Sequence, residues 1–249
     1  MLALGHEVFD ADGARFVRDR RLPDLWEANR VTAVTASSDA AIDRLLARAE
    51  REYADLGHRR FDLDFATPPA FEARLLLDGY QAREFLVMVL GGEWQGRAGA
   101  ADIRPCTDAE AWAAYDALKR DDWCESAQRL GLQQGGVGTQ MVDSHRGRCP
   151  PARYWLAWID GAPRGFVSSW QGVGGLGQVE DLYVHPDARG RGLASALIRH
   201  GVAACRRAGS GPVVIVADAD DTPRLAYSRM GFRAVAVSRA YLRRLSSSR

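Results

Sequence analysis

The stretch from Val179 to Ser195 reads V-E-D-L-Y-V-H-P-D-A-R-G-R-G-L-A-S and carries most of the information in this chain. Its first part, Val179 to Val184, is rich in β-branched and aromatic residues and ends before a proline, which predicts a strand. A polar turn with two glycines follows. Beyond the turn, apolar residues recur at helical spacing and predict a helix; they are Leu193, Leu197, Ile198, Val202 and Cys205.

A strand, a glycine-bearing turn and a helix start can together hold an anion. The first amides of a helix lack intrahelical partners, and the helix dipole adds about half a positive charge at that end. Glycine lets the backbone approach a phosphate closely, and Arg189 and Arg191 add charge. A diphosphate is the expected ligand. The P-loop and the dinucleotide fingerprint are excluded, because no Gly-Lys follows and Ser195 replaces the third glycine.

The turn also fits the pattern R-x-x-G-x-[GA] over Arg189 to Ala194. A second stretch, Pro212 to Phe232, holds a predicted buried strand, Val213 to Val216, and then a Thr-Pro pair that starts a short helix. It closes with Tyr227, which is followed after three residues by Gly-Phe. With these two signatures in this order, the chain strongly resembles the GNAT superfamily of acyl-CoA-dependent N-acyltransferases.

The resemblance implies that acetyl-CoA is the acyl donor and that the turn holds its diphosphate. It also implies that strand amides around Leu182 and Val184 meet the acyl oxygen at a bulge, where preorganised dipoles face developing charge. The sequence itself does not show a bulge. The cofactor-binding residues expected on this basis are Leu182, Tyr183, Val184, Arg189, Gly190, Arg191, Gly192, Leu193, Ala194 and Ser195.

Acyl transfer to an amine also needs an acid and a base. Tyr227 is the candidate acid for the leaving thiolate, since a tyrosine titrates near 10 and a thiol near about 8.5; the alternative is a packing role. Glu180 is the first candidate base, because strict alternation places it on the face of Leu182 and Val184. Asp181 is the alternative if a bulge changes the register. Either carboxylate could instead pair with an arginine. No metal is needed, and no ligand cluster stands out.

Composition excludes several other classes of protein. The formal net charge of +1 creates no global field that would favour nucleic acid or an anionic membrane. No run approaches the roughly 18 apolar residues of a membrane span. The four cysteines show no C-x-x-C spacing, which argues against a zinc site or a disulfide framework. The N-terminus does not resemble a secretory signal, and a cytoplasmic location is expected.

The predicted fold is mixed α/β (α+β), with a mostly antiparallel central sheet flanked by helices and two tandem GNAT-like domains. Residues 1–92 form a degenerate first domain, residues 93–100 a glycine-rich linker, and residues 101–249 the catalytic domain. A weak internal repeat supports this division: Thr67-Pro68 and Gly79-Tyr80 echo Thr222-Pro223 and Gly231-Phe232. Leu75 then stands where Tyr227 does. The alternative is that Thr-Pro and Gly-aromatic pairs at helix ends are common to α/β units and indicate no repeat.

Other segments give weaker signals. A long, polar, glycine-rich stretch at residues 131–151 predicts a loop, which is either a substrate lid or a disordered insertion. Strands are expected over 30–36, 85–90, 101–105, 154–159 and 165–171, and helices over 38–53, from Asp108 to 117 or 118, and over 122–130.

These observations predict an N-acetyltransferase that moves an acetyl group from acetyl-CoA directly to a primary amine of a small molecule or peptide. The alternative is a catalytically silent acyl-CoA-binding regulatory module. Nucleic acid and membrane are not expected partners. The sequence leaves open the amine, the acyl chain preference and the oligomeric state, and a homodimer is compatible with it.

Overall fold

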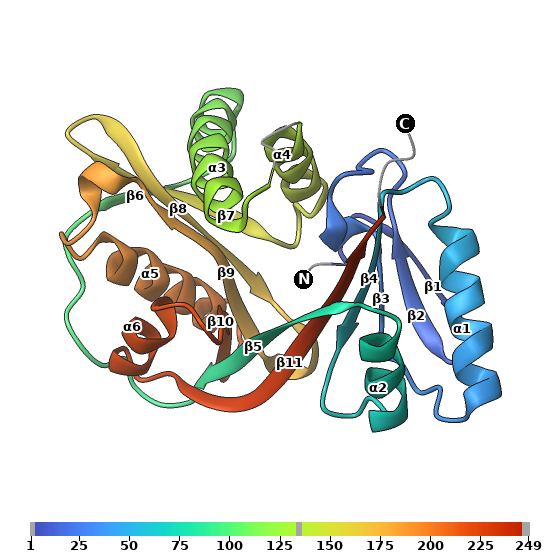
Figure 1. Ribbon diagram of the computed structural model, residues 1–249. Coiled ribbons are helices and arrows are strands. Elements are labelled where there is room, and N and C mark those ends of the chain that lie inside the picture. The colour runs from blue at the N-terminus through green and yellow to red at the C-terminus, as the bar shows by residue number, and fades with distance from the viewer. Residues whose placement is uncertain (1–2, 133–135, 246–249) are drawn as a thin grey trace. The chain divides into compact units, whose positions relative to one another are not determined.

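The computed structural model describes residues 3–132 and 136–245, which fall into two compact units (Figure 1). The C-terminal unit comprises Met88–Val216 and Thr222–Ala234. The N-terminal unit comprises the chain up to Val87, Ala217–Asp221 and the chain from Val235 onward. This division differs from that expected from sequence: residues 88–100 lie within the C-terminal unit, whereas residues 217–221 and the chain from Val235 onward belong to the N-terminal unit.

The N-terminal unit is a mixed sheet with two helices. Its strands follow the order β1-β2-β3-β4-β11, with β3 parallel to β4 and the other pairs antiparallel. The β1–β2 hairpin, which the sequence did not predict, turns at Asp12-Gly13, both with positive φ. The elements are β1 (Glu7–Ala11), β2 (Ala14–Arg18), η1 (Trp26–Ala28), β3 (Arg30–Thr32), α1 (Asp39–Glu52), β4 (His58–Leu63), α2 (Pro69–Leu77), β5 (Gln81–Leu90) and β11 (Arg233–Arg244), the last two shared with the C-terminal unit.

The repeat proposed from sequence is matched by local structure. Helix α2 ends with Gly79 at φ 80° and with the Tyr80 amide donating to the Leu75 carbonyl at 3.0 Å. The second copy ends with Gly231 at φ 100° and with the Phe232 amide donating to the Tyr227 carbonyl at 3.1 Å. Both are glycine C-caps, in which a left-handed residue closes the last helical turn.

The C-terminal unit contains both sequence signatures. Its sheet follows the order β10-β9-β8-β7-β6, in which β10 and β9 are parallel and the three following pairs are antiparallel. Helices α3 and α4 cover one face, and α5 covers the other (Figure 1). The elements are β6 (Asp102–Pro105), α3 (Ala109–Leu130), α4 (Val137–Gly147), β7 (Arg153–Ile159), β8 (Ala162–Gln171), η2 (Val173–Gly175), β9 (Gly177–Val184), η3 (Pro186–Ala188), α5 (Leu193–Arg207), β10 (Val213–Asp218) and α6 (Pro223–Arg229).

Two expectations for residues 108–151 need correction. The two helical patches predicted after Asp108 form one helix, α3, which ends at Gly131 in the left-handed conformation. The polar stretch that was expected to be a loop contains a second helix, α4, so a disordered insertion is wrong for residues 137–147. Gly136 and Gly138 hid this helix, since glycine is a poor helix former. Residues 133–135 lie outside the described part of the chain.

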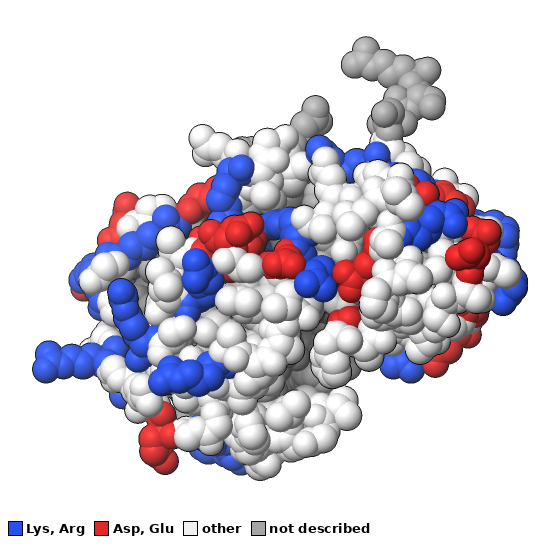
Figure 2. Space-filling view, turned by 60° about the horizontal axis from the view of Figure 1, so that its bottom comes forward, with Lys and Arg blue, Asp and Glu red and all other residues white. Residues whose placement is uncertain are grey.

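Basic and acidic side chains are interspersed over the face drawn in Figure 2. Within residues 3–132 and 136–245, no helix is both long and apolar enough to cross a membrane.

The N-cap of α3 can be tested directly. The Asp108 carboxylate accepts a hydrogen bond from the Ala111 amide at 2.8 Å, so Asp108→Ala should lower the free energy of unfolding of the C-terminal unit by about 1 kcal/mol. Urea unfolding followed by tryptophan fluorescence measures this loss. Asp108→Asn keeps an acceptor oxygen and serves as the control; an equal loss in both variants would contradict the capping role.

Candidate functional site

Strand β9 contains a bulge in the middle of the first signature. Phe166 pairs with Tyr183 and Ser168 pairs with Glu180, so a single residue of β8 lies opposite two residues of β9, Asp181 and Leu182. Asp181 has φ 54°, a left-handed conformation that aspartate adopts more readily than most residues. A bulge of this kind leaves the extra residue outside the regular ladder and re-aims the side chains beyond it. The bulge that the family resemblance implied is therefore confirmed.

The bulge changes which residues share a face. Directly paired residues of antiparallel strands lie on the same face, so Glu180 and Tyr183 both lie on the face of Ser168 and Phe166. That face is covered by α3 and α4, where Phe166 and Tyr183 belong to one buried cluster.

The expectation that Glu180 and Val184 share a face is consequently wrong. Val184 pairs with Gly165, and a side chain at Gly165 would meet the Leu197 side chain of α5 at 3.1 Å. Val184 therefore lies on the face that α5 covers. Strict alternation gave the wrong face because the bulge adds one residue to β9. Each residue after the bulge therefore points to the opposite face from the one expected.

Asp181 is held by charged and polar groups under α3 and α4. Its carboxylate accepts a hydrogen bond from the Ser168 hydroxyl at 3.1 Å and lies 3.7 Å from His145 Nε2. Burial alone would raise the pKa of Asp181. The neighbouring His145 imidazole, the charges of Lys119 and Arg148 and the bond from Ser168 outweigh burial and lower that pKa to about 2. Asp181 is therefore ionised at neutral pH.

His145 is neutral beside this carboxylate. It is fully enclosed, and burial together with the cations Arg148 and Lys119 outweighs Asp181 and lowers the pKa of His145 to about 3. Its Nδ1 lies 2.7 Å from the Tyr115 hydroxyl. A neutral imidazole has one N–H, and the arrangement assigns it to Nε2, facing the carboxylate, while Nδ1 accepts from Tyr115.

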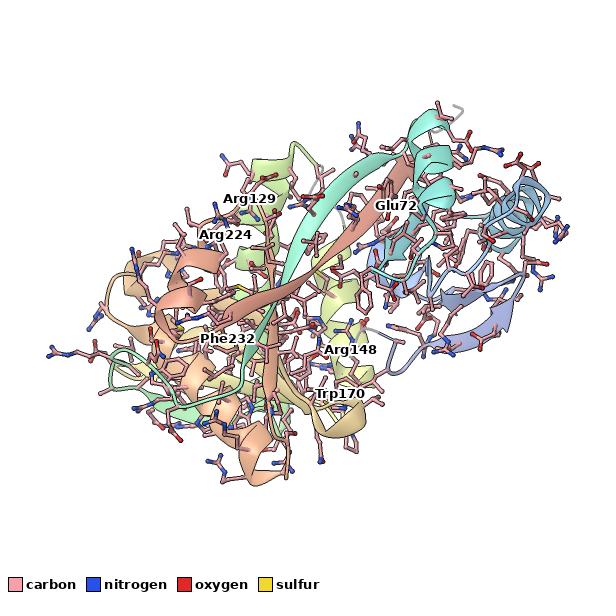
Figure 3. All side chains as sticks on the ribbon, turned by 90° about the horizontal axis from the view of Figure 1, so that it is seen from below. Glu72, Arg129, Arg148, Trp170, Arg224 and Phe232 are labelled. Atoms are coloured by element: carbon pink, nitrogen blue, oxygen red, sulfur yellow. The ribbon has the colours of Figure 1, made fainter. Side chains whose placement is uncertain are left out.

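Both cations come from the helices above the sheet. Lys119 on α3 contacts Asp122 at 2.7 Å, and its ammonium lies 5.4 Å from the centre of the Phe166 ring. Arg148, labelled in Figure 3, caps the end of α4, and its guanidinium donates to the Ser144 hydroxyl at 3.0 Å. Both side chains are almost fully buried. The site thus contains an ionised carboxylate balanced by two buried cations.

A second contact connects α3 to the turn after β9. Glu125 accepts hydrogen bonds from the Tyr183 hydroxyl at 2.8 Å and from Arg189 at 2.6 Å. Burial alone would raise the pKa of Glu125, but the bonds from Arg189 and Tyr183 lower it. Arg189 also donates to the Val184 carbonyl at 3.0 Å. The first arginine of the R-x-x-G-x-[GA] pattern is therefore fixed against the end of β9.

The turn between β9 and α5 has the geometry of an anion-binding loop. Gly190 and Gly192 have φ 75° and 78°, in the left-handed region that glycine adopts without cost. Gly192 is the N-cap of α5, so the amides of Leu193, Ala194 and Ser195 form the first helical turn. A side chain at Gly190 would meet nothing within 4 Å. The loop is open beside Gly190 and presents helix-start amides, which fits a phosphate group.

Tyr227 lies on α6, which follows β10, the parallel neighbour of β9. Its side chain is buried, with 7% exposed. Its carbonyl accepts hydrogen bonds from the Met230 and Phe232 amides, and its ring centre is 6.3 Å from that of Phe232, labelled in Figure 3. The glycine cap at Gly231 therefore fixes the residue that the sequence identified as the candidate acid.

The residues around Asp181 were missed by sequence reasoning. Tyr115, Leu118 and Lys119 stand at i, i+3 and i+4, which places a lysine on the buried face of α3. That spacing was a usable signal, because a buried lysine needs a partner. His145 and Ser168 carried no such signal, since tertiary packing alone brings them to Asp181. Within the described ranges, no group of His, Cys, Asp and Glu is arranged to hold a metal ion.

A bulged strand, an open glycine loop and a helix start thus follow one another directly on the mixed sheet of an α/β protein. Residues 136–232 match the model of the Acetyltransferase (GNAT) family. The chain contains a domain of this family.

Similar proteins agree with that assignment. A mycothiol acetyltransferase of Clavibacter sepedonicus is 33% identical over 156 residues, covering 61% of this chain and 49% of the relative. This chain spans about half the length of the curated relatives that it matches.

Solved structures resemble the fold. A GCN5-related N-acetyltransferase from Kribbella flavida has a TM-score of 0.66 at 15% identity, covering 95% of this chain and 88% of the other. A tandem GNAT protein from the clavulanic acid biosynthesis pathway has a TM-score of 0.61 at 16% identity, covering 95% and 79%. These likenesses agree with the mixed, mostly antiparallel fold and with a tandem arrangement.

The buried imidazole predicts a pH dependence of stability. The pKa of His145 is about 3 in the folded protein and about 6.5 in an unfolded chain. Because the unfolded state binds the proton first, His145 should reduce stability as pH falls from 6.5 toward 3, by up to about 1.4 kcal/mol per pH unit. His145→Gln should flatten this dependence, which thermal unfolding between pH 4 and 7 measures.

Ser169→Ala is the control for this measurement. It removes the buried hydroxyl that accepts a hydrogen bond from Trp155 Nε1 at 2.8 Å, away from His145, and introduces no group that titrates in the range, so its loss of stability should be similar at every pH. His58, buried in the N-terminal unit with its pKa lowered to about 4, contributes equally to all the proteins compared. Parallel curves for wild type and His145→Gln would contradict the neutral assignment.

Proposed function

We propose that this chain is an N-acetyltransferase that transfers an acetyl group from acetyl-CoA directly to a primary amine of a small molecule or peptide. The observation that carries the proposal is the succession of the β9 bulge and the open glycine loop at the start of α5, within a GNAT domain. Few other functions need both a bulged strand and a phosphate loop next to each other.

Residues of the loop and strand would hold the donor. In the proposal, the backbone from Arg189 to Ser195 binds the diphosphate, with Gly190 and Gly192 allowing close approach. The amides around Leu182, Tyr183 and Val184 face the acyl oxygen, where they stabilise negative charge as it develops. Acetyl-CoA, when bound, supplies an activated acetyl group on a thiol leaving group.

The reaction requires the transfer of two protons. The amine nitrogen forms a bond to the acyl carbon and gives up one proton, and the carbon–sulfur bond breaks and the thiolate takes up one. We propose that Glu180 takes up the first proton, directly or through a water molecule, because it is the carboxylate immediately before the bulge whose amides would face the acyl group. Asp181 fits this role poorly, because a base works best with a pKa near the working pH, and the pKa of Asp181 is about 2.

Tyr227 is proposed to protonate the leaving thiolate. Its place on α6 is fixed by the glycine cap at Gly231, and a phenol is a group that can act as a general acid. Asp181 takes a different part in this proposal: its ionised side chain holds the bulge in register through Ser168.

The acceptor amine is suggested by the relatives. Since a similar protein is a mycothiol acetyltransferase, mycothiol lacking its acetyl group is the first small-molecule amine to test. Calorimetric titration with acetyl-CoA followed by a free-thiol release assay over an amine panel tests the proposal. Binding with thiol release supports it. Binding without release over the panel favours the alternative, a silent acyl-CoA-binding regulatory module, and absence of binding contradicts both.

Replacing the proposed acid should separate chemistry from binding. We expect Tyr227→Phe to lower kcat by about 10²–10⁴-fold, the usual contribution of general acid catalysis, with the calorimetric Kd for CoA changed less than about threefold. Tyr80→Phe, a buried tyrosine at another glycine cap, is the control and should leave kcat unchanged. If Tyr227→Phe turns over at the wild-type rate, the tyrosine only packs.

Replacing the glycine at the N-cap of α5 should weaken donor binding. A side chain at Gly192 is strained at φ 78° and would lie 2.9 Å from a backbone nitrogen. We expect Gly192→Val to raise the Kd for CoA at least about tenfold, or about 1.4 kcal/mol. Gly211→Val, at a position with only a 3.9 Å contact, is the control. Unchanged affinity in folded Gly192→Val would refute the phosphate-loop assignment.

A further inference from the structure

The segment Gln95–Gly99, expected from its composition to be a linker, is packed against both signature motifs. The Gln95 amide donates a hydrogen bond to the Met230 carbonyl, at the end of α6, at 3.1 Å. The Gly99 amide donates to the Gly192 carbonyl, at the start of α5, at 3.2 Å. The segment therefore connects the helix that carries Tyr227 to the anion-binding loop.

The contact at Gly99 excludes any side chain. A Cβ at Gly99 would lie 2.6 Å from the Arg191 carbonyl oxygen and 3.2 Å from the Gly192 carbonyl carbon. A Cβ at Gly192 would lie 2.9 Å from the Gly99 nitrogen. Both obstacles are backbone atoms, which cannot swing aside as a side chain can. Two backbones are in direct contact here, and only glycine permits it.

The other glycines of residues 91–99 do not need to lack a side chain for this reason. At Gly91 and Gly92 a side chain would meet nothing within 4 Å. At Gly96 the nearest atom would be the Arg229 carbonyl oxygen at 3.4 Å. The close approach is thus confined to Gly99, and the earlier glycines provide matched controls in the same segment.

The hydrogen bond from Gly99 sets the direction of a loop amide. The Gly192 carbonyl and the Leu193 N–H belong to one planar trans peptide unit, so they point in opposite directions. Gly192 also accepts the first hydrogen bond of α5, from the Ala196 amide at 3.1 Å. With two donors on its oxygen, this peptide unit is fixed, and the Leu193 N–H points away from the segment.

We propose that Gln95–Gly99 is a positioning element of the acyl-CoA site, in which Gly99 holds the peptide unit that aims the Leu193 amide at the diphosphate. The inference rests on the proposed function, because it needs the loop to bind the diphosphate of CoA. It adds a third chain segment to the two signatures, and it assigns to the segment a role in donor binding.

The test compares Gly99→Val with Gly92→Val. Gly99→Val should raise the Kd for CoA at least about tenfold, whereas Gly92→Val should bind like wild type. The kcat/KM of Gly99→Val with S-acetylpantetheine, a donor without the diphosphate, should stay within about twofold of wild type, because only the diphosphate contact is lost. A general loss of structure would reduce both.

Three results would overturn the inference. Equal CoA affinity in both variants, or equal losses with CoA and S-acetylpantetheine, would remove the positioning role while leaving the proposed function intact. A wild-type protein that binds no CoA would overturn the proposed function, and this inference with it.

A measurement on the wild type covers the case in which Gly99→Val does not fold. Hydrogen exchange should show that CoA slows exchange in peptides covering 95–99 together with those at the start of α5, and not in peptides covering 153–159 of β7. Protection at α5 with unchanged exchange over 95–99 would contradict the inference. Gly99→Ala adds the colliding Cβ atom and nothing beyond it, and gives a second variant for the same affinity comparison.

Discussion

The left-handed backbone of Asp181 is the constraint on which the site depends. A residue other than glycine in this conformation costs roughly 1–2 kcal/mol, so the surroundings must hold it there. The Ser168 hydroxyl does so by donating a hydrogen bond to the ionised side chain, and the nearby cations Lys119 and Arg148 stabilise its charge. The extra residue then shifts the faces of β9. Tyr183 turns toward α3 and Glu125, and the chain enters the glycine loop with Arg189 anchored to the strand's last carbonyl.

Burying this much charge is not an obvious source of stability. Removing ions from water costs several kcal/mol each, and a well-packed apolar replacement is often as stable. The cluster instead fixes the orientation of the Asp181 side chain. An ionised carboxylate with a hydroxyl partner accepts only a few orientations, whereas a leucine would accept many. The neutral state of His145 results from the same balance. Two cations already compensate Asp181, and an imidazolium in that place would add an uncompensated charge.

The sequence predicted those strands and helices whose positions depend on residues that lie close together in the chain. The strand, turn and helix from Val179 to Cys205 were predicted by β-branched and aromatic residues, by the two glycines and by helical spacing. The Thr-Pro and Gly-Phe pairs predicted the two ends of α6. The bulge could not be derived in this way, because Asp181 adopts φ 54° only under α3 and α4, whose residues lie far away in sequence. Helix α4 was hidden by its glycines. His145 could not be paired with Asp181, far along the chain, by any local pattern.

The glycine-rich stretch at residues 91–99 shows why composition alone misjudges a segment. Glycine serves two opposite purposes: it permits freedom where nothing is near, as at Gly91 and Gly92, and it permits close packing where a Cβ would collide, as at Gly99. Sequence cannot separate the two, since the distinction lies in what packs opposite. The close packing at Gly99 also affects the geometry of the candidate site. A segment bonded at one end to the Met230 carbonyl and at the other to the Gly192 carbonyl fixes the spacing between the Tyr227 helix and the glycine loop, and the proposed acyl transfer requires that spacing to match the donor.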